Sequence, residues 1–322
     1  MKSQPMKSKT VHGRVAWLVL LSGPWLSAAA QQTAAIDGVV AAGIPIELVK
    51  DGFEAVEGPT PQSDGGLLFT NNRAGRVMRI AADGSVSTWY EGPGGANALT
   101  PTIKGEIAAT LVDGKTISVL KPGEAPREIV GNYEGTPFNR PNDLVADRRG
   151  NIYFTDTPSP TATTAPAMPA AVYQLTAKGK LVRITTDITR PNGVALSPDE
   201  RTLYVADTTG EWIHAIKLSR KGEAKERREF AKLETPPPQN GAKPSSGSDG
   251  LAVDEKGRVY AATTLGVQVV SAEGSPLGII AMPKQPQNLA FSGPGRSVLF
   301  VVGRGSVYRI ATLTHGPDRP GK

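Results

Sequence analysis

The stretch RPNDLVADRRGNIYFTD, residues 140–156, decides the fold. It predicts two strands joined by a tight turn, because an apolar run at 144–146 and a β-rich run at 152–155 flank the polar residues 147–151. The polar pair Asn142-Asp143 stands at the entrance to the first strand. The second strand brings the chain back to the side where Asn142 lies.

The same pattern recurs along the chain, each time with a polar lead residue, a short apolar strand and a returning β-rich strand. The lead residues are Glu57, Asn97, Asn142, Asn192, Asp249 and Asn288, at spacings of 39 to 57 residues with a mean of about 46. A period near this length, with about four short strands per unit, is typical of a β-propeller blade. Because a blade buries its faces only by stacking on its neighbours, six copies predict an all-β, six-bladed β-propeller.

The two ends of the repeat region predict how the ring closes. The last repeat offers three strands of its own, at 288–292, 297–302 and 305–311. We expect Ile46–Val49, which follows Pro45, to join the last blade as its outer strand; an ordinary edge strand is the alternative. The expected domains are a signal peptide at 1–30, a loosely ordered linker at 31–45, the propeller at 46–312 and a flexible tail at 313–322.

The N-terminal residues predict export. A basic segment ends at Arg14, an apolar run extends from Val15 to Leu26, and Ala28-Ala29-Ala30 offers a cleavage site before Gln31. The alternative is a membrane anchor, but the run is shorter than the ~20 residues needed to span a bilayer. We therefore expect a periplasmic or secreted protein with no stable membrane insertion after cleavage.

Charge and composition exclude several function classes. The net charge is +6, but residues 1–30 hold four basic residues and no acid, so the remainder carries only +2. That charge is too small and too scattered to indicate nucleic-acid binding. The chain has no cysteine, which excludes disulfides, thiolate metal sites and a cysteine nucleophile. A monomer that acts on a small molecule is expected.

Up-and-down strand order predicts where the polar residues meet. The first strand of each blade runs away from its lead residue, so all six lead residues should ring one mouth of the central tunnel. The two longest insertions, 157–171 and 235–248, should lie over the same face. A ring of carboxylates and amides suits a hard cation such as Ca²⁺, Mg²⁺ or Mn²⁺. The alternative is that each lead residue only caps a turn.

The chain resembles the gluconolactonase, senescence-marker-protein and luciferin-regenerating-enzyme family of six-bladed propellers, over about residues 46–312. The motifs that carry this resemblance are Glu57-Gly58-Pro59, residues 140–143 (RPND), 191–200 (PNGVALSPDE), 203–207 (LYVAD), 248–250 (SDG) and 288–291 (NLAF). The chain departs from the family pattern at Thr60-Pro61, at Asn97-Ala98-Leu99 and in the insertion after Thr157. These departures lie on the substrate side, so the resemblance says more about the metal than about the substrate.

The resemblance implies one divalent cation, with Ca²⁺ first and Mg²⁺, Mn²⁺ or Zn²⁺ as alternatives. Its ligands would be Glu57, Asn192 and Asp249, with Asn142 beside the metal as a ligand or through water. Arg140 matches a substrate-contacting position, although a surface ion pair is a close alternative for it. The implied chemistry is metal-assisted hydrolysis of a small lactone, with Asp249 as the candidate general base.

Other catalytic arrangements lack residues. The three histidines, His12, His214 and His315, are not lead residues, which argues against a histidine-based lactonase mechanism and a Ser-His-Asp triad. The sequence thus predicts an exported metal-dependent lactonase. The rival is a non-catalytic propeller that binds a ligand or a cell-envelope partner. A third hypothesis, a strictosidine-synthase-like enzyme, needs a catalytic carboxylate elsewhere in the tunnel, and none can be assigned.

Overall fold

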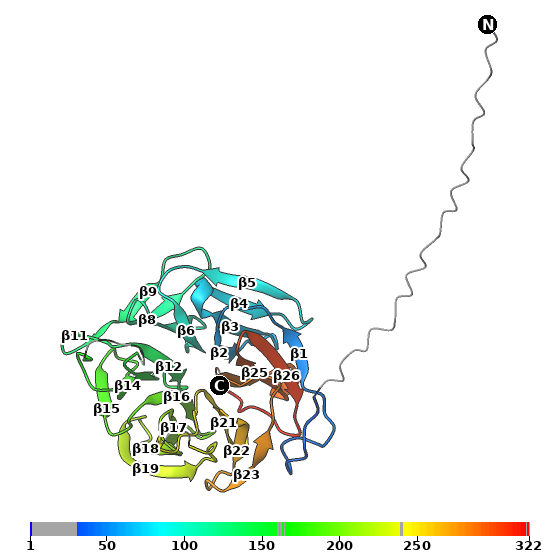
Figure 1. Ribbon diagram of the computed structural model, residues 1–322. Coiled ribbons are helices and arrows are strands. Elements are labelled where there is room, and N and C mark those ends of the chain that lie inside the picture. Colours follow the sequence, from blue (N-terminus) through cyan, green and yellow to red (C-terminus); the bar gives the residue numbers. More distant parts are fainter. Residues whose placement is uncertain are drawn as a thin grey trace.

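The computed structural model describes residues 1, 31–159, 161, 163, 165–238, 241–319 and 321. Six antiparallel sheets of four strands each are arranged in a ring, which confirms the predicted six-bladed β-propeller (Figure 1). The predicted signal peptide, residues 1–30, lies outside the described residues apart from Met1. Among the residues that are described, no helix is long and apolar enough to cross a membrane.

Each blade is an up-and-down sheet whose strands follow chain order. Blade one consists of β2 (Val56–Pro61), β3 (Leu67–Asn71), β4 (Arg76–Ile80) and β5 (Val86–Glu91), with a short 3-10 helix, η1 (Asn72–Ala74), after β3. Blade two consists of β6 (Ala96–Pro101), β7 (Ile107–Leu111), β8 (Thr116–Leu120) and β9 (Arg127–Val130). Blade three consists of β12 (Pro141–Ala146), β13 (Ile152–Asp156), β14 (Ala171–Leu175) and β15 (Leu181–Thr185), preceded by the small hairpin β10 (Asn132–Tyr133) and β11 (Thr136–Pro137).

The second half of the ring repeats this order. Blade four consists of β16 (Pro191–Leu196), β17 (Thr202–Asp207), β18 (Trp212–Leu218) and β19 (Ala224–Lys232). Blade five consists of β20 (Leu251–Val253), β21 (Val259–Thr263), β22 (Gly266–Val270) and β23 (Pro276–Ile280). Blade six holds β24 (Asn288–Ser292), the 3-10 helix η2 (Pro294–Arg296), β25 (Val298–Gly303) and β26 (Ser306–Ala311).

The N-terminal strand closes the ring as predicted. Strand β1 (Glu47–Lys50), one residue further along than expected, pairs antiparallel with β26 and completes blade six. Glu47 lies opposite Arg309 in this register, and their side chains form an ion pair at 2.7 Å. The first and last parts of the propeller are therefore held in a single sheet.

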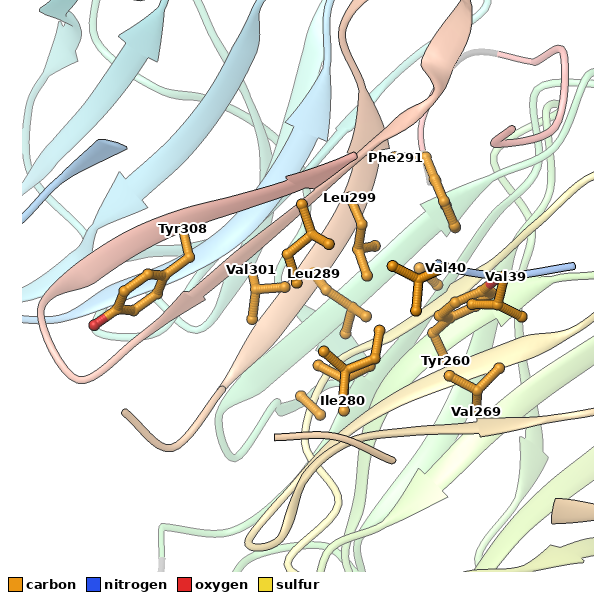
Figure 2. Packing of buried hydrophobic residues seen from close by; sticks show 14 of the residues in the cluster. Val39, Val40, Tyr260, Val269, Ile280, Leu289, Phe291, Leu299, Val301 and Tyr308 are labelled. Atoms are coloured by element: carbon orange, nitrogen blue, oxygen red, sulfur yellow. The ribbon is translucent and has the colours of Figure 1, made fainter. Parts of the chain in front are cut away.

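The segment before β1 is packed, whereas the sequence indicated a loosely ordered linker at 31–45. Ile36, Val39 and Val40 are buried in the hydrophobic cluster between blades five and six. Figure 2 shows Val39 and Val40 beside Tyr260 of blade five. The apolar side chains of this short segment cover an otherwise exposed edge of the core, and burial of that surface stabilises the packing.

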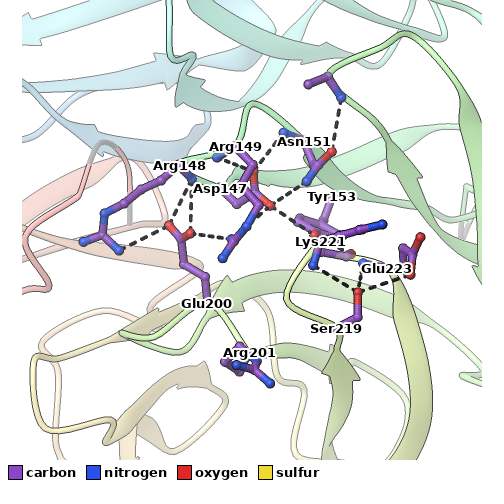
Figure 3. Close-up of polar contacts among 12 residues, drawn as sticks. Asp147, Arg148, Arg149, Asn151, Tyr153, Glu200, Arg201, Ser219, Lys221 and Glu223 are labelled. Atoms are coloured by element: carbon purple, nitrogen blue, oxygen red, sulfur yellow. Dashed lines mark hydrogen bonds and ion pairs between the residues drawn. The ribbon is translucent and has the colours of Figure 1, made fainter.

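The face opposite the lead residues is held by a polar network between blades three and four (Figure 3). The Glu200 carboxylate is 2% exposed and accepts the backbone N–H of Arg148 at 3.1 Å. It also pairs with the Arg149 guanidinium at 3.1 Å. Asp147, at the turn after β12, accepts the backbone N–H groups of Arg149 and Asn151. These contacts fix the β12–β13 turn against the neighbouring blade.

The C-terminal residues lie across the same face, and this differs from the flexible tail expected at 313–322. Thr314 and Arg319 are buried, and the tail runs to the centre of the ring (Figure 1). Arg319 donates to the backbone oxygens of Leu196 at 2.9 Å and Ser197 at 3.3 Å, in blade four. Further contacts join the tail to blade three (Arg148 to Asp318 O), blade five (Thr314 to Asp254) and blade six (Arg296 to Pro317 O). The tail thus covers the tunnel mouth opposite the lead residues.

Candidate functional site

The structure brings the six lead residues together around one mouth of the tunnel, and every adjacent pair of blades is in contact there. The contacts between side chains are Asn288 Nδ2 to Glu57 Oε2 at 3.2 Å and Asn97 Nδ2 to Asn142 Oδ1 at 3.4 Å. The others involve backbone: Asp143 Oδ2 accepts Val194 N at 3.1 Å, Gly193 N donates to Asp249 O at 3.0 Å, and Gly250 N donates to Gln287 O at 2.7 Å. A Cβ on Gly58 would lie 2.3 Å from Asn97 O, so the first strands of blades one and two also lie close together at this mouth.

The lead residues of blades one to four lie on irregular parts of their strands. The pairing register of the first strand shifts between Glu57 and Thr60, and at the equivalent residues of β6, β12 and β16. A β-bulge bends the strand and changes the direction of a side chain. These bulges therefore account for lead residues that leave the regular ladder at the tunnel mouth.

Buried threonines at the end of the second strand hold these bulges in place. Thr70, Thr110 and Thr155 are each fully buried, and each donates its hydroxyl to the backbone oxygen of the lead residue in the next blade. Two of them also accept a backbone N–H from the irregular region of their own blade: Thr110 from Ala98 and Thr155 from Asp143. The positions of Asn97, Asn142 and Asn192 thus depend on the blade that precedes each of them.

Glycines after the lead residues allow the first strands to approach one another. A Cβ on Gly193 would lie 2.2 Å from Asp249 O, and one on Gly250 would lie 2.0 Å from Asn288 Oδ1. Real Cβ atoms do not come this close to other atoms, so no larger residue fits without a shift of backbone. The Asn-Gly and Asp-Gly pairs therefore bring neighbouring blades together at the mouth, which is a different use from the hairpin turn that such pairs commonly indicate.

Amide groups orient the oxygens of the expected metal ligands. Glu57 is 8% exposed, and its carboxylate accepts Gln287 Nε2 at 3.1 Å as well as the Asn288 amide. Asn192 donates Nδ2 to Thr208 Oγ1 at 3.0 Å, which leaves its Oδ1 as the atom that can act as a ligand. Asp249 is partly exposed just before β20, and its backbone is fixed by the Asp249 N–H donating to Ala262 O at 2.8 Å.

This donor set fits a hard divalent cation. It offers two carboxylates, Glu57 and Asp249, and the amide oxygens of Asn192 and Asn142, with neither sulfur nor imidazole among them. Within the described residues, no group of three or more His, Cys, Asp or Glu side chains is placed to hold a metal ion. A cation here would therefore depend on the asparagine oxygens, and oxygen-only coordination with mixed carboxylate and amide ligands is what Ca²⁺ accepts.

Asp156 and Asp207, at the ends of β13 and β17, support the loops beside the ring. Asp156 is fully buried and accepts the backbone N–H of Arg140 at 2.6 Å and that of Asn139 at 2.9 Å. Burial raises the pKa of Asp156 above its ordinary value, although these N–H groups oppose the change. Asp207 accepts the backbone N–H of Arg190 at 3.1 Å in the same manner. Both carboxylates thus fix backbone that precedes a lead asparagine.

Arg140 lies at the edge of this mouth, in a cavity of about 640 Å³. Its backbone oxygen accepts the N–H of Thr157 at 3.3 Å. Residues of the insertion that follows Thr157, including Pro158 and Ala165, line the same cavity, in agreement with the position expected for that insertion. The guanidinium of Arg140 forms no ion pair within the described part of the chain.

Three kinds of residue at this mouth were not predicted from the sequence. Gln287 directly precedes the lead residue of blade six. Arg190 lies two positions before the lead residue of blade four, as Arg140 does before that of blade three. The repeated Arg-Pro-Asn at 140–142 and 190–192 was a signal for Arg190. The bulge-holding threonines end the similar segments 67–70 (LLFT), 107–110 (IAAT) and 152–155 (IYFT), which was also a readable signal. Gln287 has no repeated counterpart that would have revealed it.

Comparison with known proteins gives a consistent result. Residues 55–304, which include most of all six blades, match the family model described as SMP-30/Gluconolactonase/LRE-like region. A gluconolactonase of Zymomonas mobilis subsp. mobilis is 28% identical over 309 residues, covering 87% of this chain and 85% of that protein. The lactonohydrolase oryL of Aspergillus oryzae is 31% identical over 212 residues, covering 56% of this chain and 46% of that protein.

Solved structures resemble the whole propeller. A gluconolactonase from Xanthomonas campestris superimposes with a TM-score of 0.75 at 27% identity, covering 84% of this chain and 90% of that chain. A calcium-binding regucalcin from Agrobacterium tumefaciens superimposes with a TM-score of 0.70, covering 85% of this chain and 95% of that chain. At 20% identity, the regucalcin shows a shared fold only.

Proposed function

Because the chain belongs to the SMP-30/gluconolactonase/LRE-like family of lactonase-type hydrolases, we propose that it opens a small sugar-type lactone with the help of one divalent cation. Ca²⁺ is the first candidate for the cation, and Mg²⁺, Mn²⁺ and Zn²⁺ are the alternatives. The observation that carries the proposal is the ring of six lead residues, in which two carboxylates and four amides meet at one tunnel mouth.

Glu57, Asn192 and Asp249 would hold the cation, and Asn142 would contact it directly or through water. When bound, the cation would polarise the lactone carbonyl and stabilise the negative charge that develops on its oxygen. The surrounding amides prepare this site before anything binds. Gln287 and Asn288 fix both oxygens of Glu57, Thr208 fixes the amide of Asn192, and Asn97 donates to Asn142.

Asp249 is the proposed general base. The oxygen of the attacking water bonds to the acyl carbon, and Asp249 accepts the proton that this water loses. The bond between the acyl carbon and the ring oxygen then breaks, and the ring oxygen takes the proton that Asp249 accepted, so the product is a hydroxy acid and Asp249 is ionised again. A carboxylate oxygen that faces a dication is a weak base, so the other oxygen of Asp249 takes the proton. Arg140 would bind hydroxyl or anionic groups of the substrate at the rim.

A lactone panel tests this function. The purified protein is assayed by proton release with aldono- and aliphatic lactones, after chelation and after restoring Ca²⁺, Mg²⁺, Mn²⁺ or Zn²⁺. We expect turnover of at least one lactone that disappears on chelation and returns with a metal. Metal binding without turnover of any lactone would contradict the enzyme and favour a non-catalytic binding propeller. Turnover that persists without metal would contradict the role of the cation.

Export is a separate proposal that rests on the basic and apolar pattern of residues 1–30. Cleavage after Ala30 would leave Gln31 as the first residue of the mature protein. N-terminal sequencing of protein recovered from the periplasm or the medium tests this. A chain that keeps its first residues and stays in the cytoplasmic or membrane fraction would contradict it.

A further inference from the structure

Arg140 and Arg190 occupy equivalent positions in neighbouring blades. Each precedes a Pro-Asn pair whose asparagine is a lead residue. Each backbone N–H donates to the carboxylate that ends the second strand of its own blade, Asp156 or Asp207. Each backbone oxygen accepts the N–H of the residue after that aspartate, at 3.3 Å from Thr157 and 3.0 Å from Thr208. The two side chains therefore start from matching points on the rim of the same mouth.

The two guanidinium groups lie near one another. Arg190 donates from one of its terminal nitrogens to Pro158 O at 3.5 Å. Pro158 in turn lines the cavity of about 640 Å³ that Arg140 also lines. Both arginines thus lie beside the start of the insertion that follows Thr157, at the entrance to the proposed catalytic site.

The carboxylates of Asp156 and Asp207 accept hydrogen bonds from groups other than the two guanidinium groups. Asp156 accepts the backbone N–H groups of Asn139 and Arg140 and the side-chain amide of Asn139. Asp207 accepts N–H groups of Arg190 and Thr209 and the Thr209 hydroxyl. Within the described residues, neither aspartate forms an ion pair with the Arg140 or Arg190 guanidinium. The aspartates at the ends of β13 and β17 therefore leave donors of both guanidinium groups available for a ligand.

Apart from Arg140, the charged residues that line the cavity carry opposite charges. Lys115 and Asp113, both exposed, line it on the side of blade two. They add one positive and one negative charge, so the excess positive charge of the cavity lining comes from Arg140. Arginine presents a planar fork that matches a carboxylate or phosphate with two parallel hydrogen bonds, which lysine cannot do. A neutral hydroxyl would use only part of that capacity.

We propose that the natural lactone carries an anionic group, a carboxylate or a phosphate, held between Arg140 and Arg190 while its ring lies at the lead residues. This inference rests on the proposed lactonase function and names its substrate class. The neutral aldonolactones would then be poorer substrates than their acidic counterparts. Arg190 is the specificity-determining residue, because Arg140 also borders the reacting ring.

Matched lactones test the proposal. D-Glucono-1,4-lactone and D-glucaro-1,4-lactone differ by a hydroxymethyl group in place of a carboxylate. D-Glucono-1,5-lactone and its 6-phosphate make the same comparison for a phosphate. We expect kcat/KM to be higher for the acidic member of one pair, and which pair responds separates carboxylate from phosphate. Arg190→Gln should lower the acidic-to-neutral ratio on the order of tenfold to a hundredfold, as loss of a charge-assisted bidentate contact does.

Two control variants make the result interpretable. Arg220→Gln removes the same charge from the β18–β19 turn of the same blade, on the opposite face, and should leave the ratio unchanged. Arg190→Lys keeps the charge but loses the fork and should restore only part of the preference. A ratio near one in the wild type, or a ratio that Arg190→Gln and Arg220→Gln change equally, would overturn the anion site while leaving the lactonase function intact.

A binding measurement separates this inference from the lactonase function. Methyl β-D-glucuronide and methyl β-D-glucoside differ only in the carboxylate, and neither can be opened as a lactone. Calorimetric titration should show tighter binding of the glucuronide, weakened about tenfold or more by Arg190→Gln. If no lactone is hydrolysed but this difference is found, the lactonase function fails and the anion site stands. Equal affinities for the two glycosides, with no response to 6-phosphogluconate either, would overturn the site.

Discussion

Thr155, at the end of the second strand of blade three, donates its hydroxyl to the backbone oxygen of Asn192, the lead residue of blade four, at 2.7 Å. The same relationship joins Thr70 to Asn97 and Thr110 to Asn142. Blades one, two and three thus each position the lead residue of the next blade. The lead asparagines of blades two, three and four therefore depend on contacts between neighbouring blades.

Thr155→Val should test this coupling. Valine keeps the shape of the fully buried side chain but removes the donor to Asn192 and the acceptor of Asp143 N–H. We expect a loss of about 1–3 kcal/mol in the free energy of unfolding, together with weaker cation binding, because the Asn192 bulge loses its support. Denaturant unfolding and calcium titration measure the two effects. Thr155→Ser keeps the hydroxyl and should retain most of both; equal losses in Val and Ser variants would contradict the coupling.

Glu57→Gln should weaken cation binding without removing side-chain volume. The Glu57 carboxylate accepts two amide donors, Gln287 and Asn288, so a glutamine would both lose the charge and oppose one donor with another. Since ligand charge sets the affinity of oxygen sites, we expect calcium affinity to fall at least about tenfold. The rise of Tm that calcium gives the wild type should shrink accordingly. Asp83→Asn, in the β4–β5 turn on the opposite face, is the matched control and should keep the wild-type response.

His214 makes stability depend on pH. Burial and the neighbouring Arg227 guanidinium, 3.0 Å from Nδ1, lower the pKa of His214 from its ordinary value of 6.5, against the opposing effect of Asp207 and Glu229. Below about pH 6.5 the unfolded chain therefore binds a proton at His214 more readily than the folded chain does. The contribution of His214 to the free energy of unfolding is fully present above this pH and is lost as the pH falls below it. His214→Gln should flatten this fall.

Urea unfolding of wild type and His214→Gln between pH 5 and 8 measures that effect as a difference, which cancels the titration of other groups. His315→Gln, on an exposed residue of the tail, is the control and should keep the wild-type slope. A His214→Gln curve parallel to that of the wild type throughout would contradict a buried neutral histidine.

Arg319→Met should destabilise the propeller, because Arg319 lies at the tunnel mouth opposite the lead residues. Arg319 is 3% exposed, and burial lowers its pKa to about 10. Methionine would leave the backbone oxygens of Leu196 and Ser197 without this donor, at a cost of about 1–3 kcal/mol in the free energy of unfolding. Asp318→Asn, at an exposed side chain next to it, should cost little. Full stability in both Arg319→Met and a chain that ends at Thr312 would contradict a structural role for the tail.

The repeat pattern predicted the six blades, the closure by an N-terminal strand and the family. These follow from signals that local sequence carries: alternating apolar strands, turn residues and a lead residue at a regular spacing. Residues 31–45 and the C-terminal tail were misjudged because small and polar residues indicate loops without saying what the loops pack against. Val39 and Arg319 are buried only because a closed ring offers them an edge and a tunnel mouth.

The candidate site shows the same division. The lead residues could be named from sequence because they recur, and the ring geometry brings them together. The contacts that orient the lead residues could not be predicted from the sequence. The hydrogen bond from Gln287 to Glu57, for example, joins residues that are 230 positions apart in the chain. Asp143 follows its lead residue at the position where Gly193 and Gly250 follow theirs. Its carboxylate accepts the Leu144 N–H in its own strand and the Val194 N–H in blade four, so it joins two blades.

Asp249 is proposed as both ligand and base, and Asp249→Asn under saturating calcium tests this most directly. Asparagine keeps an oxygen for the cation but cannot accept the proton of the attacking water. With cation occupancy verified by calorimetry, kcat for the best lactone of the panel should fall at least about a hundredfold, as loss of a general base does. A variant that binds calcium and turns the lactone over at the wild-type rate would contradict the proposed mechanism.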